Sequence, residues 1–445
     1  MKGLKKVICL IATLAVVTGA FAGCGSADEK KNDGQATNFT EKKPEDYKGE
    51  ITFWHFNKDE SPAIVAAFTK KYPNVKVNLQ VIPDKDQAYQ NKITQTLANG
   101  GDMPDVFCGE SAVVKRFVNL EGAFADLSQA PFNADEIAKK MVPATVDIGR
   151  DDSGKIRALT YQVTPGGIGY KREIAKQYFG TDDPDKISEM MSTPEKLLEM
   201  AKTLKDKSAG KVKFFASRQE LEKIYFGART DGWVKDGKLT VDPMIDKYVD
   251  MAKTYRSEGL ETGQEQWAQP WSAGIAGNDA FAYAIPTWGI ANIVECNDAK
   301  RKDKGLWGIA KSPISYCWGG TWLGVYSKSK NKELAWLFVK FMTADKDQMK
   351  QWSKDRGDFM NNVDLINELA TSGDVNKTFN QNPYAVFKPS LDTINGKLFT
   401  QYDDRITAAF DDNMASFLAG KISKDDMYKK FKEKVKSDFP DLKVE

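Results

Sequence analysis

Histidine occurs once in this sequence of 445 residues, at His55, and this limits the catalytic chemistry that the chain can perform. A Ser-His-Asp triad would have to use His55, and no Gly-x-Ser-x-Gly motif supplies a nucleophile. A zinc site with two histidines is excluded, and no Asp-x-Asp-x-Asp-Gly calcium loop is present. We therefore predict no metal, no cofactor and no enzymatic activity.

A P-loop is also excluded. Residues 232–238 have the glycine and lysine spacing of that motif, but Leu239 stands where a magnesium-binding Ser or Thr is needed. The pair Asp236-Gly237 is typical of a β-hairpin turn. We interpret this segment as a hairpin.

Tryptophan is the residue type whose pattern points to binding. Six of the ten tryptophans lie between Trp267 and Trp322. A sugar presents flat patches of C–H bonds and a rim of hydroxyls, so its site needs aromatic faces beside polar side chains. For each tryptophan, packing in a hydrophobic core is the alternative to binding a ligand. The candidates for stacking, which lie in or beside turns, are Trp271, Trp288, Trp318 and Trp322, and Trp54, at a strand end, is a further candidate for the site.

Polar candidates for the same site lie at predicted strand ends and loops. For each of them, a position on the outer surface is the alternative to lining the site. They are His55, Asn57, Glu110, Ser111, Gln162, Arg218 and Asp358, and Gly320 joins them from a glycine pair.

The elements that position these residues alternate between strand and helix. Residues 51–56 are apolar and aromatic, Ser61-Pro62 is typical of a helix start, and Pro73 ends that helix. A strand over 75–82, a helix over 86–98 and a buried strand over 105–108 follow. This order predicts parallel strands whose carboxyl ends, with Trp54, His55 and residues 109–111, meet at one crevice. A second α/β lobe and a helix-rich C-terminal part are expected beyond it.

The N-terminus has the pattern of a secretory signal. Three lysines precede an apolar run over 7–22, and residues 21–24 read Phe-Ala-Gly-Cys. This resembles a bacterial lipobox, in which Cys24 is lipidated, although Phe21 departs from the usual Leu; an ordinary signal-peptidase site followed by an incidental cysteine is the alternative. Residues 25–48 are polar and predict a tether.

Charge and cysteine content exclude further classes. The chain has 64 basic and 62 acidic residues, so we expect no nucleic-acid partner. Apart from Cys9 in the signal and Cys24 at the anchor, the chain has Cys108, Cys296 and Cys317, an odd number without metal-like spacing. We expect buried thiols, with a bridge between Cys296 and Cys317 as the alternative.

A set of motifs, in order, is similar to the bacterial extracellular solute-binding proteins of the sugar ABC importer type, family 1, which includes maltose-binding protein. In the motif at 167–173, Lys171 stands where that family usually has Asn. The Gly319-Gly320 pair and the segments after it are the best local match. The motifs lie at 51–54, 72–77, 101–106, 167–173, 276–283, 319–325 and 331–336.

The resemblance implies an α/β, two-lobe periplasmic-binding-protein-like fold with discontinuous lobes, hinge segments and a ligand cleft between them. It places hinges near 161–164, 309–313 and 344–348. With the N-terminal pattern, the predicted organisation is a signal peptide over 1–23 and a lipidated tether over 24–48, then an N-terminal lobe over 49–161 and 310–345 and a C-terminal lobe over 162–309 and 346–445.

The function that follows from the resemblance is capture of a carbohydrate, an oligosaccharide rather than a monosaccharide, and its delivery to the permease of an ABC importer. We expect a monomer held by its lipid at the outer face of the bacterial cell membrane. Two rivals stay open. The same fold can bind a non-sugar solute, and a pair of acids in an aromatic cleft can also hydrolyse glycosides.

Overall fold

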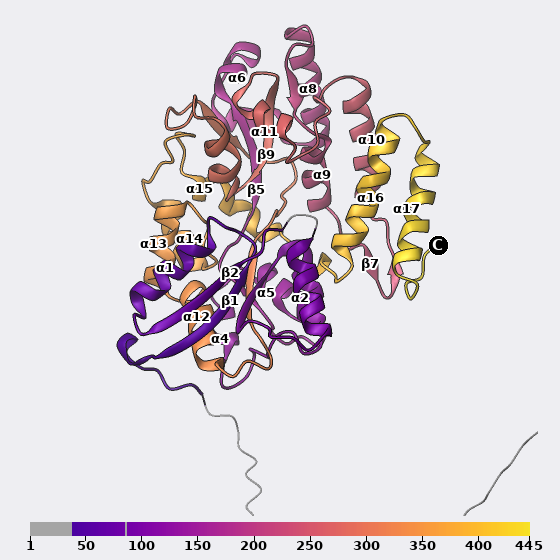
Figure 1. The fold of residues 1–445 in the computed structure, drawn as a ribbon. Helices are drawn as coiled ribbons and strands as arrows, with labels where there is room; N and C mark the ends of the chain where they lie inside the picture. The colour runs from indigo at the N-terminus through magenta and orange to yellow at the C-terminus, as the bar shows by residue number, and fades with distance from the viewer. Residues whose placement is uncertain (1–37, 85–86) are drawn as a thin grey trace, which may run out of the picture. The chain divides into compact units, whose positions relative to one another are not determined.

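The first sheet confirms the predicted β-α-β-α-β order. Strand β1 (Gly49–His55) pairs in parallel with β2 (Val75–Val81) and β3 (Val106–Glu110), and the connections run through α1 (Ser61–Lys71) and α2 (Ala88–Ala98). Two antiparallel strands from later in the chain, β11 (Thr321–Val325) and β4 (Leu159–Thr160), complete the order β2-β1-β3-β11-β4. This sheet is the centre of the first lobe of the computed structural model (Figure 1). The structure describes residues 38–84 and 87–445.

Local sequence explains these elements. Pro62 lies in the first turn of α1, where its missing N–H costs nothing, and the helix ends before Pro73. The carboxylate of Asp105 accepts bonds from the backbone N–H of Thr52 at 2.9 Å and from its hydroxyl at 3.0 Å. This contact fixes the start of β3 against β1. Figure 1 shows α1 and α12 (Lys332–Thr343) beside these strands.

The second lobe surrounds a four-stranded sheet of order β10-β5-β9-β6. Strand β5 (Gly166–Lys171) is antiparallel to β10 (Trp307–Ala310) and β9 (Ala280–Pro286), and β6 (Lys213–Phe215) is parallel to β9. Helices α8 (Pro194–Lys207), α9 (Arg218–Gly227) and α10 (Pro243–Ser257) contribute to its core.

The remaining helices complete both lobes, and α16 lies beside α10 and α17 in Figure 1. They are α3 (Ser111–Asn119), α4 (Ala134–Ala138), α5 (Pro143–Gly149), α6 (Arg172–Phe179), α7 (Pro184–Met190), α11 (Gln269–Ala276), α13 (Lys346–Arg356), α14 (Val363–Thr371), α15 (Pro383–Phe387), α16 (Asp403–Leu418) and α17 (Lys424–Asp438), with short helical turns at Pro44–Asp46, Lys388–Thr393 and Gly396–Leu398 and a π-helix at Ile290–Glu295. The hairpin β7 (Val234–Lys235) and β8 (Lys238–Leu239) forms at the predicted turn.

Lys171, which departs from the family motif, is completely buried in the second lobe. Its ammonium donates to the carbonyls of Gly274 at 3.1 Å and Ala280 at 2.8 Å, and it lies 5.3 Å from the ring centre of Tyr283. Burial lowers the pKa of Lys171 to about 7. The residue therefore ties α11 to the start of β9 and does not face a cleft.

The chain crosses between the lobes where the hydrophobic cores change. Tyr161 packs in the first core and Val163 in the second lobe, as the predicted hinge at 161–164 requires. The return crossing lies between Tyr316 and Trp322, later than 309–313, and α13 still packs on the first lobe through Met349, which moves the third crossing beyond 344–348. The predicted lobe boundaries stay a prediction with these shifts.

Several expectations concern residues outside the described part of the chain. The signal peptide over 1–23, the lipidated Cys24 and the tether up to residue 37 lie there. Within the described residues, no helix is both long and apolar enough to cross a membrane. Cys108, Cys296 and Cys317 all carry free thiols in this structure; Cys108 is buried as expected, but Cys296 is exposed and Cys317 is only partly buried.

Candidate ligand-binding site

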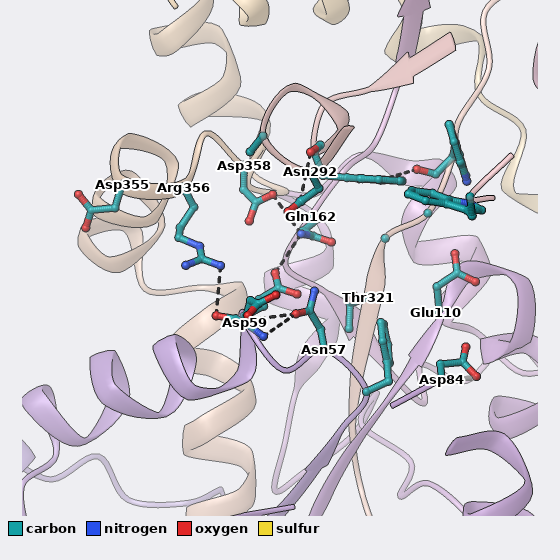
Figure 2. A pocket seen from close by; sticks show the side chains of 18 residues that line it. Asn57, Asp59, Asp84, Glu110, Gln162, Asn292, Thr321, Asp355, Arg356 and Asp358 are labelled. Carbon is teal, nitrogen blue, oxygen red and sulfur yellow. Dashed lines mark hydrogen bonds between the residues drawn. The ribbon is translucent and has the colours of Figure 1, made fainter. Parts of the chain in front are cut away.

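A cavity of about 680 Å³ lies between the two lobes. Sites of this volume accommodate small organic ligands. The first lobe contributes the β1–α1 turn and the end of β3, and the second lobe contributes loops around β9 and α11 (Figure 2). The lining residues are Phe56, Asn57, Asp59, Glu60, Asp84, Glu110, Gln162, Trp267, Trp288, Ala291, Asn292, Trp318, Gly319, Gly320, Thr321, Asp355, Arg356 and Asp358.

Three tryptophans form an aromatic wall of this cavity. The rings of Trp267 and Trp288 are nearly parallel, at 15°, with centres 6.0 Å apart, and Trp318 lies edge-on to Trp288 at 5.1 Å. The indole N–H of Trp288 donates to the carbonyl of Trp318 at 2.8 Å, which fixes its ring plane. Trp267 is 55% exposed, which is unusual for so large an apolar side chain. The wall therefore offers indole faces to a ligand.

The glycine pair 319–320 makes the wall fit. Gly319 has φ +86° and Gly320 φ +103°, both in the range that side chains rarely adopt. A Cβ on Gly319 would lie 2.7 Å from Nε1 of Trp288, and one on Gly320 would lie 3.1 Å from the ring of Trp322. Only glycine allows the backbone to pass this close to Trp288.

Two buried carboxyls face each other on the opposite side of the cavity. The side-chain amide of Gln162 donates to Glu60 at 3.3 Å and to Asp358 at 3.1 Å, and the indole of Trp352 donates to Asp358 at 2.7 Å. Burial raises the pKa of both carboxyls. The neighbouring charge of Asp358 raises the pKa of Glu60 further. Gln162 thus bridges the two acids and lies between them (Figure 2).

The remaining polar groups sit on turns that the sequence fixes locally. The Asn57 side chain accepts from the backbone N–H of Asp59 at 2.9 Å and of Glu60 at 3.0 Å, which shapes the β1–α1 turn. Glu110 caps α3 by accepting from the N–H of Ala112 at 2.8 Å, and desolvation raises its pKa. Figure 2 shows Glu110 and Asp84 at one side of the cavity and Asp355 and Arg356 at the other.

The structure brings seven of the thirteen predicted ligand-binding residues to this cavity. They are Asn57, Glu110, Gln162, Trp288, Trp318, Gly320 and Asp358. Ser111 lines a neighbouring cavity of about 510 Å³, which shares Glu110, Trp318 and two further residues with the first. Whether these residues hold a ligand stays a prediction.

Trp54 and His55 lie beneath the cavity instead of facing it. Trp54 is 8% exposed, and its carbonyl accepts from the hydroxyl of Tyr89 on α2. The imidazole of His55 is buried, its Nδ1 accepts from the N–H of Asn57 at 2.9 Å, and desolvation lowers its pKa to about 3. His55 is therefore neutral and orders the turn that presents Asn57.

Two tryptophans chosen from the sequence are core residues. The indole of Trp322 on β11 donates to the carbonyl of Thr145 at 2.9 Å in the first lobe. Trp271 on α11 is completely buried, donates to Glu220 at 2.9 Å and lies beneath Trp267, 5.3 Å between ring centres. It supports the aromatic wall without lining it.

Arg218 is also buried, at 2% exposure, in the core of the second lobe. Its guanidinium donates to Glu222 at 3.0 Å, to the hydroxyl of Tyr248 at 2.8 Å and to Asp411 at 2.8 Å. These bonds join α9 and α10 to α16, and the side chain does not line the cavity.

Sequence reasoning missed Trp267 and most of the acidic lining. No clear signal in the sequence identifies Trp267, because its exposure depends on the start of α11 at Gln269, two residues after it. Asp59 and Glu60 follow Asn57 directly and share its turn. Asp355 and Arg356 end α13, a helix whose docking on the first lobe the sequence does not reveal.

Comparison with known proteins assigns the family. Residues 63–372 match the model of the bacterial extracellular solute-binding protein family. Because this match spans more than half of the chain, the protein belongs to that family, whose members bind solutes outside the cytoplasm.

Solved structures agree on the fold. A crystal structure of an extracellular solute-binding protein of family 1 has a TM-score of 0.75 at 19% identity, covering 87% of this chain and 99% of that one. The GacH receptor of Streptomyces glaucescens gives 0.71 at 19%, covering 89% and 100%. The galacto-N-biose/lacto-N-biose I-binding protein of Bifidobacterium longum gives 0.71 at 16%, covering 89% and 99%. The fold is therefore the two-lobe α/β fold of these binding proteins.

Proposed function

We propose that this protein captures a carbohydrate, an oligosaccharide in preference to a monosaccharide, in the cavity between its lobes and delivers it to the permease of an ABC importer. The observation that carries the proposal is the wall of Trp267, Trp288 and Trp318 opposite carboxylates and amides in one cavity. Indole faces cover the C–H patches of a pyranose, and the polar groups bond its hydroxyls.

Similar proteins support this choice of ligand. The GacH receptor was solved in complex with acarbose, and the Bifidobacterium longum protein, part of an ABC transporter, in complex with lacto-N-biose. A binding protein of Bifidobacterium animalis subsp. lactis, associated with an ABC transporter, was solved with β-1,6-galactobiose. The neighbouring cavity that shares Glu110 and Trp318 offers room for further sugar units.

Binding alone is the activity we propose. A glycosidase needs the scissile bond between its two acids. Here the amide of Gln162 already bonds both Glu60 and Asp358, so this buried pair is a positioning network. A ligand that contacts both lobes stabilises the lobe arrangement to which it binds more tightly. We propose that the permease selects this loaded arrangement.

Attachment to the membrane completes the proposal. We infer a monomer anchored by a lipid on Cys24 at the outer face of the cell membrane. A Cys24→Ala variant is expected to leave the membrane fraction and to lose incorporation of labelled fatty acid. Retention of the label by that variant would refute the anchor.

The test of the ligand is thermal unfolding of the full chain, purified in mild detergent, against mono- and oligosaccharides, with titration calorimetry of each hit. A ligand at 100 times its Kd adds about 2.7 kcal/mol to the stability. We expect a saturable shift with one sugar class, a smaller shift in a Trp267→Ala variant at the same sugar concentration, and no new reducing ends. A cooperative melt that no sugar shifts would overturn the carbohydrate assignment, and released product would overturn binding as the sole activity.

A further inference from the structure

The charge of the cavity differs from that of the chain. The sequence balances 64 basic residues against 62 acidic ones. Among residues 38–84 and 87–445, the cavity lining has one guanidinium, that of Arg356, and six carboxyls. These carboxyls belong to Asp59, Glu60, Asp84, Glu110, Asp355 and Asp358.

These six carboxyls are not neutralised by cations of the protein in residues 38–84 and 87–445. None of them forms an ion pair within 4.0 Å there. Their partners are neutral instead. The side-chain amide of Gln162 donates to Glu60 and Asp358, that of Gln90 donates to Asp84 at 2.8 Å, and that of Gln351 donates to Asp355 at 2.7 Å. The cavity lining therefore has an excess of carboxyls over cations of the protein.

Arg356 leaves this excess in place. Its guanidinium lies 5.4 Å from the ring centre of Trp352 and donates to the carbonyl of Asp59 at 3.4 Å. Figure 2 shows it at the same side as Asp355, away from Asp84 and Glu110. On the far side, the cation that acts on Glu110 is Lys223, which is not within ion-pair distance of that carboxyl.

A ligand that fills the cavity removes water from these carboxylates. Sugar hydroxyls replace the lost hydrogen bonds but not the lost solvation of the charge, whereas a cation offsets both. Indole faces add attraction, because the π face of tryptophan favours a cation as well as C–H bonds. The ammonium of Lys223, 5.1 Å from the ring centre of Trp318, already uses one indole of the wall in this way.

We propose that the preferred ligand is a carbohydrate that carries a protonated amine, recognised jointly by the Trp267–Trp288–Trp318 wall and the carboxylates of the cavity. The proposal rests on the proposed function and names its substrate class. Burial raises the pKa of Glu60, Asp358 and Glu110, Glu60 to about 8, so a cation that enters the cavity favours the ionised form of these carboxyls.

The test compares two probes of one scaffold, the β-1,4-linked glucosamine trimer and its N-acetylated, uncharged counterpart. Calorimetry on the full chain in detergent is run at a pH at which the amines are protonated, alongside the neutral sugars of the thermal panel. We expect the amine-bearing trimer to bind at least about tenfold more tightly, a preference of about 1.4 kcal/mol. Added salt weakens only the charged probe, because it screens the attraction.

Variants assign the preference to the carboxylates. Asp59→Asn and Asp355→Asn change exposed side chains, so both variants are expected to fold. Each is expected to weaken the charged probe several-fold more than it weakens neutral sugars, because a neutral sugar loses at most a hydrogen bond whereas the charged probe also loses the attraction of the carboxylate. Glu199→Gln on α8, an exposed carboxylate outside the cavity, is the matched control and is expected to change neither.

The outcomes separate the two proposals. If a neutral sugar binds as tightly as the charged trimer, or if only neutral sugars bind, the amine preference is overturned while carbohydrate binding stands. If both cavity variants keep the full preference, its assignment to these carboxylates is refuted. If no sugar binds, charged or neutral, the proposed function fails together with the inference.

Discussion

The substitution Gly319→Ala isolates the contribution of the aromatic wall to binding. Gly319 has φ +86°, and its added Cβ would lie 2.7 Å from Nε1 of Trp288, closer than any real contact allows. The indole of Trp288 has to move, and its 2.8 Å bond to the carbonyl of Trp318 breaks or lengthens. One methyl group thus shifts the ring plane that the proposed ligand contacts.

The expected magnitude has two parts. Placing an alanine in the left-handed region costs about 1–2 kcal/mol of folding free energy, independent of the ligand. Loss of the Trp288–Trp318 hydrogen bond adds about 0.5–1.5 kcal/mol. Because the displaced ring also meets the sugar at a wrong angle, we expect Kd to rise about tenfold, which corresponds to about 1.4 kcal/mol.

Gly154→Ala is the matched control. Gly154 has the same φ of +86°, but no atom lies within 4 Å of its added Cβ. Urea unfolding is expected to show a backbone cost in both variants, and calorimetry a loss of affinity in Gly319→Ala alone. If Gly319→Ala bound the sugar as tightly as the native chain, the wall would not be part of the site as described.

Three further outcomes follow from the structure. Trp267→Ala removes a side chain that is 55% exposed, so we expect binding to fall at least about tenfold with unfolding free energy changed by less than about 1 kcal/mol; a large loss of stability with intact binding would contradict this. The carboxyls of Glu60 and Asp358 have raised pKa values, so the native chain loses stability as pH rises above the ordinary Glu value of 4.5; Glu60→Gln is expected to flatten that loss in pH-dependent urea unfolding, and an unchanged slope would refute the coupling. Arg218→Met leaves its acidic partners without their cation and is expected to cost about 3–5 kcal/mol of unfolding free energy. A variant with native stability but weakened binding would show instead that Arg218 contacts the ligand.

The sequence predicts the first sheet and the turns at its edge because those depend on local signals. Pro62 and Pro73 mark where α1 starts and stops, and the strand order follows from the crossovers. Asn57, Glu110 and Gln162 lie near strand ends and reach the cavity for that reason. Trp54 and His55 are at such an end too, but helices cover both faces of this sheet, so alternation along the strand does not tell which side chain faces the ligand.

The remaining residues depend on contacts that are distant in sequence. Arg218 follows β6 as a ligand-binding residue would, yet it pairs with Asp411, 193 residues later, and only the docking of α16 reveals this. Trp271 and Trp267 differ in exposure because α11 begins between them, at Gln269. The acidic lining from α13 depends in the same way on where that helix docks.

The cavity and the lobe crossings use the same segments, and this links ligand binding to lobe geometry. Val163 donates its N–H to the carbonyl of Phe359 at 2.8 Å, and Trp318 donates its N–H to the carbonyl of Thr164 at 3.0 Å, so three strands of chain run side by side where the lobes meet. Gln162, Trp318 and Asp358 are carried by these same segments. A rotation of one lobe about the crossings would therefore change the distance between the aromatic wall and the carboxyl pair. A sugar that contacts both has different affinities for the two lobe arrangements, which is the physical condition for a ligand to shift the balance between them.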